Sequence, residues 1–541
     1  MSKSINALWG FILSGVILLN FIVSGLSAQE MLTKEHGNRM PLLMPDDFSE
    51  LNLVAWRVEN GKPDKNNPLI EGEMPWDAGS VMSYGTILID PIDGLWKAWI
   101  FCAPAEVEMK GLSSKNEGNS HLCYFESKDG VHWIRPELPY FPYGKYKKTN
   151  LMFDGKKVVS RRWASVIVNP KNKEWPYEMF VFQGIAQERR YLEKLWNEGY
   201  SMLSRYHSKD GKAWECINEN IKGPMNSAVA FVYPDGKGGY ITYYCELRNV
   251  RKTDYKPVWD YAGANGAVRT ISRAVSKDGN SFFRNPDRIL VDKDARDHPD
   301  AEYFELVPIK VKGGYIAMIT MDFPINGVLN LRMAASRDGI HWWYPDRRQC
   351  LNNPPLGDYG GGMIFQTKNL IVQNDTLFVY YGGSEGLHSD LHDTRKHRKK
   401  IGMEYVADEA SGALPTNGAL CRAYWRFDRM YALAPVAGGP TLGMAVTKEA
   451  DLAGKQLRIN LKTRPPKKVS KPNFDAGYLQ VELLNADGNP IPGFTRSDCP
   501  RLSGDYKSLL VKWKGGDKAP KGAKKAKFYL KRAFLYGFEF K

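Results

Sequence analysis

Ser336-Arg-Asp-Gly-Ile-His-Trp342 belongs to a seven-residue pattern that recurs along this chain. The other copies are Ser127-Lys-Asp-Gly-Val-His-Trp133, Ser208-Lys-Asp-Gly-Lys-Ala-Trp214 and Ser276-Lys-Asp-Gly-Asn-Ser-Phe282. Each copy follows a short strand-like run, and Asp-Gly between such runs is a strong signal for a hairpin turn. The pattern therefore predicts a structural turn before a return strand, with no catalytic role.

The spacing of these turns predicts the fold. Successive copies begin 81, 68 and 60 residues apart, which leaves room for a four-stranded sheet and its loops. Regular short strands with turn signals and a sheet-sized repeat favour an all-β fold, a five-bladed β-propeller. Four blades contain the repeats, and we expect a fifth blade to be closed from strands near both ends of the domain.

The domain organisation has three parts. Residues 1–28 are expected to be a signal peptide, and residues 29–440 the propeller. Residues 441–541 contain alternating runs such as Leu457–Leu461 and Gly477–Leu484, which are typical of a small β-sandwich. We interpret this sandwich as an accessory domain.

Composition and charge narrow the function. The chain has 541 residues, 43% hydrophobic and 25% charged, which excludes a disordered, collagenous, coiled-coil or multi-span membrane protein. Its formal net charge is +15, and residues 453–541 hold 20 Lys+Arg against 7 Asp+Glu. The predicted propeller is therefore nearly neutral and the sandwich basic, which suggests either an anionic partner or a soluble lysine-rich surface.

The N-terminus predicts export. Lys3 precedes an apolar run, Ala7–Val23, and small residues follow as far as Ala28, as in a secretory signal cleaved near Ala28. The alternative is an uncleaved anchor helix. With the signal removed we expect no transmembrane span, a periplasmic or extracellular location, and a monomer. Nucleic acid is then not an expected partner.

The cysteines point to no redox or zinc chemistry. There are seven, without a C-x-x-C pair: Cys102, Cys123, Cys216, Cys245, Cys350, Cys421 and Cys499. This is neither a zinc site nor a disulfide scaffold, and buried thiols with one or two bridges are the simpler interpretation. We expect no cofactor, and the sequence offers no support for a structural divalent cation.

Several stretches resemble one group of proteins. They are the repeated turns together with Tyr84-Gly-Thr-Ile-Leu-Ile-Asp90, Val379-Tyr-Tyr-Gly-Gly-Ser-Glu-Gly-Leu-His388 and Val481-Glu-Leu-Leu-Asn-Ala-Asp-Gly488. The chain resembles secreted bacterial five-bladed propellers related to glycoside hydrolase families 32 and 43, the invertases and arabinanases. This resemblance implies a carbohydrate-active protein, with its site at the central end of the propeller and a polysaccharide or oligosaccharide as substrate.

The resemblance also implies catalytic carboxyl groups near the starts of the innermost strands. Glycoside hydrolysis uses one carboxyl group as acid and another as base or nucleophile. Asp77 is our candidate base, and Asp300 or Glu302 the acid. The alternative for each is a carboxylate that caps backbone N–H groups or pairs with a nearby arginine.

Two arginines favour a second reaction. The N-D-P-N, R-D-P and E-C motifs of invertases are absent, and Arg161-Arg162, before Trp163, stands where an acid is expected. Guanidinium groups bind carboxylates, so the substrate could be a uronate. A lyase or dehydratase would then use Arg162 to neutralise the carboxylate and His298 or Tyr84 to remove a proton.

The remaining candidates are substrate contacts. They are Asn226, Asp358, Glu385 and His388. His388 and His392 share a face only on a helix, so the pair does not predict a metal site. A non-catalytic glycan-binding propeller stays open, and a sialidase is disfavoured because its turn motif is one residue longer.

Overall fold

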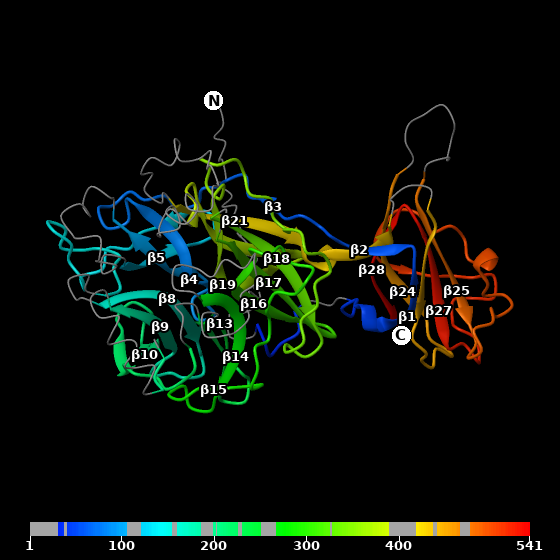
Figure 1. Ribbon diagram of the computed structural model, residues 1–541, viewed down its shortest axis with the longest axis horizontal. Helices are drawn as coiled ribbons and strands as arrows, with labels where there is room; N and C mark the ends of the chain where they lie inside the picture. The colour runs from blue at the N-terminus through cyan, green and yellow to red at the C-terminus, as the bar shows by residue number, and fades with distance from the viewer. Residues whose placement is uncertain are drawn as a thin grey trace, which may run out of the picture.

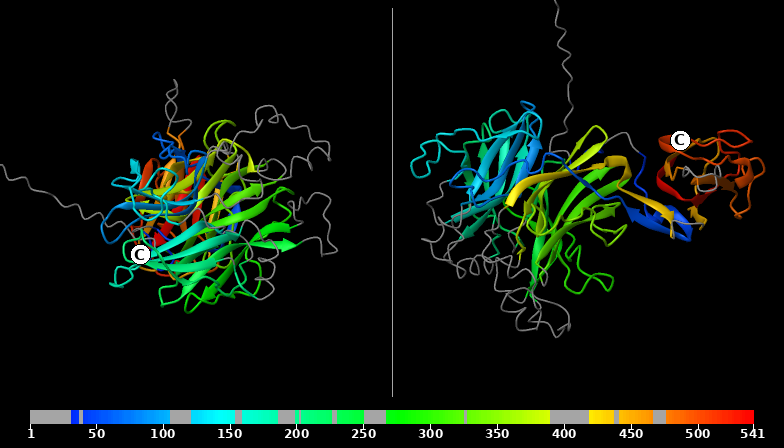
Figure 2. Two further views of the ribbon diagram at one scale, coloured as in Figure 1. Left: turned by 90° about the vertical axis from the view of Figure 1, so that its left-hand side faces the viewer. Right: turned by 90° about the horizontal axis from the view of Figure 1, so that it is seen from above.

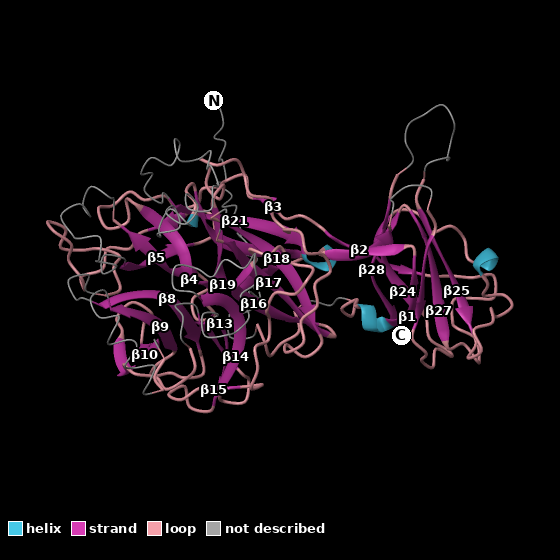
Figure 3. Cartoon of the chain, viewed as in Figure 1, coloured by secondary structure: helices cyan, strands magenta, loops and turns pink. Residues whose placement is uncertain are grey.

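The computed structural model describes residues 31–36, 40–104, 121–153, 159–185, 199–201, 203–225, 230–249, 267–324, 327–388, 418–436, 441–465 and 476–541. Among them, the helical segments with defined bounds are the short η2 (Pro45–Asp47), η6 (Phe427–Arg429) and η7 (Arg496–Asp498). All other regular elements are strands, so the prediction of an all-β chain is confirmed (Figure 3). No helix in the described ranges is long and apolar enough to span a membrane.

Five sheets follow one another along most of the chain. The first contains β4 (Ser80–Ile89), β5 (Trp96–Ala103), β6 (His121–Ser127) and β7 (Trp133–Ile134). The second contains β8 (Val159–Val168), β9 (Tyr177–Ile185), β10 (Leu203–Ser208) and β11 (Glu215–Asn218). The third contains β12 (Ala230–Pro234), β13 (Tyr240–Asn249), β14 (Ala267–Ser276) and β15 (Phe283–Arg284).

The fourth and fifth sheets complete this part of the chain. The fourth contains β16 (Glu302–Val311), β17 (Gly314–Phe323) and β18 (Val328–Ser336). The fifth contains β19 (Met363–Gln373), β20 (Thr376–Ser384), β21 (Gly418–Arg426) and β3 (Lys62–Pro63). Because β3 comes from the N-terminal side and pairs with β21, the last sheet joins two distant parts of the sequence.

The five sheets form a ring around their first strands. β4 contacts β8 and β19, β8 contacts β12, and β16 contacts β19. The third and fourth sheets meet where β13 and β14 contact β16. We call these five sheets the ring and β4, β8, β12, β16 and β19 its inner strands (Figure 1).

The repeated Ser-Lys/Arg-Asp-Gly turns have a structural role. In the first turn, Ser127 Oγ accepts a hydrogen bond from the Gly130 backbone at 2.9 Å, and Asp129 Oδ1 accepts two more from the next two residues. Gly130 has a φ of 73°, a conformation that glycine adopts without strain. The Asp-Gly turn thus forms as the sequence predicted.

Each turn also binds the preceding sheet. The contacts are Tyr380 Oη to Gly130 O at 2.8 Å, Trp99 Nε1 to Gly211 O at 2.7 Å, Arg205 Nη1 to Asp278 O at 2.6 Å, and Tyr243 Oη to Gly339 O at 2.9 Å. The first of these contacts joins the fifth sheet to the first. The repeats therefore hold neighbouring sheets together at four of the five junctions of the ring, all except that between the fourth sheet and the fifth.

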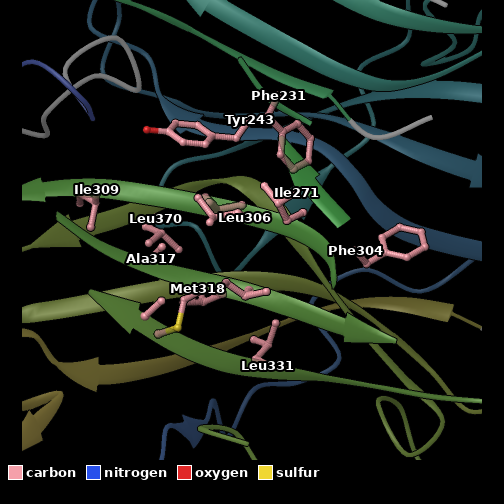
Figure 4. Packing of buried hydrophobic residues seen from close by; sticks show 14 of the residues in the cluster. Phe231, Tyr243, Ile271, Phe304, Leu306, Ile309, Ala317, Met318, Leu331 and Leu370 are labelled. Carbon is pink, nitrogen blue, oxygen red and sulfur yellow. The ribbon is translucent and has the colours of Figure 1, made fainter. Parts of the chain in front are cut away.

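The ring is filled by apolar side chains between sheets and polar ones along the inner strands. Leu306, Met318 and Leu331 are fully buried between sheets (Figure 4). Polar side chains on the inner strands instead donate to carbonyl groups of other sheets: Thr86 to Ala164 at 2.7 Å, Asn369 to Ile87 at 2.9 Å and Lys368 to Val166 at 3.0 Å. These bonds fix the inner strands against one another.

Two further sheets form a second module. One has the order β1-β23-β27-β25, with β1 (Phe48–Asn52), β23 (Gly443–Thr447), β27 (Lys525–Lys531) and β25 (Tyr478–Leu484). The other has the order β2-β22-β28-β24-β26, with β2 (Val54–Val58), β22 (Tyr431–Pro435), β28 (Ala533–Phe540), β24 (Leu457–Thr463) and β26 (Asp505–Leu510). The module is set apart from the ring in Figure 2.

The division between the two bodies differs from the expected boundaries of 29–440 and 441–541. β1 and β2 precede the ring in sequence, and β22 ends before residue 441, yet all three hydrogen-bond within the second module. The chain therefore starts its strands in the second module, runs through the ring and returns. Ion pairs from Lys312 to Glu539 and from Asp375 to Lys507 connect the ring with β28 and β26.

Candidate active site

Three sheets of the ring bring charged side chains together at the start of β16. Glu302 is the first residue of β16 and lies opposite Asp322, near the end of β17. Arg269 reaches them from β14, and His388 from the segment that follows β20. We call Arg269, Glu302, Asp322 and His388 the charged cluster.

Glu302 is the most unusual carboxyl group of the cluster. It is 1% exposed, and its Oε2 accepts hydrogen bonds from Arg269 Nη1 at 2.8 Å and from the Arg269 backbone at 3.3 Å. Its Oε1 is buried and has no hydrogen-bond partner among the described residues. The pKa of Glu302 is raised to about 7, because burial and the nearby Asp322 carboxylate together raise it more than Arg269 lowers it. A carboxyl group in this state can donate a proton near neutral pH.

Arg269 links the two carboxyl groups. Its Nη1 lies 2.8 Å from Glu302 Oε2 and 3.1 Å from Asp322 Oδ2. Two oxygens that share one nitrogen at these distances lie within about 6 Å of each other. Burial works against the Arg269 cation, but the carboxylates outweigh it and raise the pKa of Arg269. Arg269 therefore stays charged and fixes the geometry of both acids.

His388 adds a basic group beside Asp322. Its Nδ1 lies 3.3 Å from Asp322 Oδ2, and its side chain is 12% exposed. The imidazole of His388 also packs edge-on against the Phe304 ring, with centroids 5.8 Å apart. A carboxylate in contact with one ring nitrogen orients an imidazole, an arrangement found in many general bases.

Aromatic side chains continue the site from the charged cluster across the ring. Phe365 lies 5.5 Å from Phe304 and 4.4 Å from Tyr84, and Tyr84 lies 4.9 Å from Trp163, between ring centroids. These four rings come from four inner strands, although none is more than 8% exposed. They pack against one another and form an apolar layer beside the acids.

Local irregularities of the inner strands place these groups. The pairing registers of β4, β8, β16 and β19 shift within the strand, which marks β-bulges. Such bulges redirect side chains and are common beside active sites. Trp163 lies at the bulge of β8 with a φ of 56°, a conformation that is rare for a bulky residue.

Several residues predicted from the sequence lie in this one place. Tyr84, Trp163, Glu302 and His388 are joined by the contacts described above. Just before β16, Asp300 is 1% exposed, and its backbone N–H lies 3.2 Å from Nδ1 of the exposed His298. The His298 ring lies 6.2 Å from Phe323, the neighbour of Asp322. His298 is thus at the rim of the same site.

Asp77, in the loop before β4, has a full set of partners. Its Oδ1 accepts hydrogen bonds from the backbone N–H groups of Glu73 and Met74 at 2.8 and 2.7 Å. Its Oδ2 accepts one from Arg135 Nε at 2.9 Å, and Asp77 is completely buried. This carboxylate organises the loop before β4, so we do not include it in the site.

The remaining candidates are two loop residues and three residues that lie wholly or partly outside the described part of the structure. Asp358 is exposed in the loop before β19, and Glu385 is half-buried just after β20. Arg161 and Arg162 lie in β8, but their side chains are outside the described part of the structure, as is the whole of Asn226.

Arg269 and Asp322 were not among the residues predicted from the sequence. Asp322 follows the strongly apolar run of β17, where an acidic residue is unexpected, and that was the available signal. Arg269 carried no comparable signal. Among the described residues, no group of three or more His, Cys, Asp or Glu side chains could hold a metal ion.

No family model matches this chain, and no curated protein matches it. Solved structures do resemble it. One, a complex of BT0996 and RGII, is 12% identical, covers 69% of this chain and 92% of its own, and has a TM-score of 0.42. A β-1,2-mannobiose phosphorylase from Listeria innocua is 15% identical over 69% of this chain and 98% of its own, with a TM-score of 0.41. A putative glycosidase from Bacteroides thetaiotaomicron is 14% identical over 67% and 96%, with a TM-score of 0.40.

These neighbours are glycoside hydrolase-like proteins. That is the resemblance which the sequence motifs predicted.

Proposed function

We propose that the protein is an exported carbohydrate-active enzyme with a five-bladed β-propeller and a basic β-sandwich, and that it hydrolyses glycosidic bonds in an anionic polysaccharide or its oligosaccharides. The ring of five sheets, closed by β3 on β21, supports the propeller interpretation. The two-sheet second module supports the sandwich interpretation.

The state of Glu302 carries the proposal for catalysis. In hydrolysis, Glu302 gives its proton to the glycosidic oxygen as the bond to the anomeric carbon breaks. A water molecule attacks that carbon and loses a proton to His388, which Asp322 holds in place. Burial keeps Glu302 protonated near neutral pH, as a general acid requires. Arg269 holds both carboxyl groups in place.

A product assay with one variant tests this proposal. Purified protein is incubated with a panel of neutral and anionic glycans, and both new reducing ends and unsaturated-uronate absorbance are recorded. Hydrolysis predicts reducing ends without the absorbance, and Glu302→Gln should abolish them. Activity that is unchanged in Glu302→Gln, or no product from any glycan, would contradict the assignment; the second result is that expected of a non-catalytic glycan-binding propeller.

One observation favours elimination as a second candidate. The contact between His388 and Asp322 forms a base beside a charged arginine, which is what removal of a proton next to a uronate carboxylate needs. Arg269 would neutralise the substrate carboxylate, His388 would take the C5 proton, and Glu302 would protonate the leaving oxygen. Unsaturated products that disappear in His388→Gln would support this reaction over hydrolysis.

A further inference from the structure

The second module carries a cationic surface far from the charged cluster. Strand β27 places Lys527, Tyr529 and Lys531 on one side of its sheet and Ala526, Phe528 and Leu530 on the other; the second group is completely buried. Strand β25 adds Tyr478, directly opposite Lys531. The outer side of these two strands thus carries lysine and tyrosine side chains, together with Gln480 and Glu482.

Two arginines complete this surface. Arg496 lies over the Tyr529 ring at 4.5 Å, and Arg501 over the Tyr478 ring at 4.7 Å. Arg496 Nε also donates to Gln480 Oε1 at 3.2 Å. Stacking on a ring restricts a guanidinium group before any ligand arrives, which lowers the entropy cost of binding. We call Arg496, Arg501, Lys527 and Lys531, with Tyr478 and Tyr529, the basic face.

The four cations of the basic face have no carboxylate partner in the described part of the chain. Two acidic side chains lie on the same side of the sheet. Glu482, opposite Lys527, is 7% exposed and accepts hydrogen bonds from Tyr529 Oη at 2.5 Å and the Arg496 backbone at 3.2 Å. The exposed Glu50 of β1 lies opposite Val446, which is itself opposite Lys527. By contrast, Lys507 and Lys312 of the opposite contact region are both paired with acids. The four cations outnumber Glu482 and Glu50, so the basic face carries an excess of positive charge.

Its position leaves it open to a large ligand. The other sheet of the module makes the contacts with the ring, through β26 and β28. In Figure 1, β27 and β25 lie on the side of the module farther from the ring. Lys527 and Lys531 are four residues apart on one strand, a separation of about 13 Å, which suits an extended ligand better than a small ion.

We propose that the basic face binds a polyuronate, a polysaccharide with a carboxylate on successive sugars. Stacked guanidinium groups recognise planar carboxylates through paired hydrogen bonds, and tyrosine edges contact the faces of sugar rings. This inference goes beyond the proposed function, because it concerns a separate surface. Its role would be to hold the enzyme on a polymer whose bonds the ring site cleaves.

The test measures binding by the full mature chain in the Glu302→Gln background, so that cleavage does not interfere. One variant combines R501Q, K527Q and K531Q. A matched control combines K512Q, K518Q and K521Q, which removes three exposed lysines of the same module and has the same net charge. Ligands are polygalacturonate, dextran sulfate and uncharged dextran, and thermal melts check that each variant is folded.

We expect the loss of binding to depend on the basic-face residues and on the carboxylates of the ligand. The basic-face variant should bind polygalacturonate about tenfold more weakly and with a smaller dependence on salt, and the control within about twofold of the parent protein. Uncharged dextran should not bind. Equal losses in the two variants, no loss in either, or a loss confined to dextran sulfate would overturn the proposal. None of these outcomes depends on whether Glu302 is catalytic.

Discussion

Glu305 allows a quantitative test of how burial inside the ring changes the pKa of a carboxyl group. It lies three residues after Glu302 on β16 and is 1% exposed. Its Oε2 accepts a hydrogen bond from Thr320 Oγ1 at 2.8 Å, and its Oε1 has no hydrogen-bond partner in the described residues. Burial raises the pKa of Glu305 from 4.5 to about 8, although the bond from Thr320 opposes this. Glu305 is therefore protonated in the folded protein at neutral pH.

The raised pKa of Glu305 determines the sign and size of the change in the free energy of unfolding with pH. Below pH 4.5 the folded and unfolded chains both carry the proton. Between pH 4.5 and about 8 the unfolded chain loses it first, so the free energy of unfolding falls by about 1.4 kcal/mol per pH unit. The loss reaches about 3 kcal/mol at pH 7 and about 5 kcal/mol above pH 8. Glu305→Gln mimics the protonated acid and removes this loss.

The measurement is urea unfolding followed by tryptophan fluorescence at pH 5, 6, 7 and 8. The difference in free energy between Glu305→Gln and the parent protein should be under about 1 kcal/mol at pH 5 and rise steadily to pH 8. Glu137→Gln is the control, because that carboxyl side chain is 79% exposed. Lys368, whose pKa burial lowers to about 7, is common to all three proteins and cancels. A difference that does not grow with pH, or an equal rise in the control, would refute the reasoning.

Three further predictions concern the site and its support. Glu302→Gln should lower kcat/KM by about 10²–10⁴-fold, and parent activity should fall above pH 7 as this acid loses its proton; a Gln variant with the same alkaline fall would contradict the role. Asp77→Asn should cost about 2–3 kcal/mol in urea unfolding without altering the pH profile of kcat/KM, whereas a large catalytic loss at unchanged stability would restore Asp77 as the base. Arg422→Met should cost about 3 kcal/mol, because Asp64 loses its ion pair at 2.6 Å next to the β3–β21 pairing; a loss under about 1 kcal/mol in the same assay would argue against this.

The turns could be predicted from the sequence because their causes are local. Ser336, Asp338 and Gly339 make their hydrogen bonds within three residues of one another, so the seven-residue pattern contains all that the turn requires. Its contact with the preceding sheet is different. Tyr243 donates to Gly339 across 96 residues, and no local pattern indicates such a partner.

The site was predictable only in part for the same reason. Glu302 is predictable because it is an acid near the start of an inner strand. Its raised pKa, however, depends on Arg269, 33 residues earlier, and on Asp322, 20 residues later. Asp77 looked equivalent in sequence, yet Arg135 and two backbone N–H groups occupy its oxygens. What separates a reactive carboxyl group from a structural one here is the set of donors that the fold supplies, and those donors are distant in sequence.

The bulge in β16 explains how one strand supplies both unusual acids. In a regular strand, the side chains of residues three apart point to opposite faces of the sheet, so Glu302 and Glu305 could not lie on the same face. The register shifts between Tyr303 and Glu305, which leaves Phe304 as the extra residue. Glu302 then lies opposite Asp322 and Glu305 opposite Thr320, while the Phe304 ring packs under Arg269 at 5.1 Å. The same irregularity that seats the guanidinium group beside Glu302 also buries a second acid deeper in the ring, so the proposed catalytic acid and the pH-dependent stability have one structural origin.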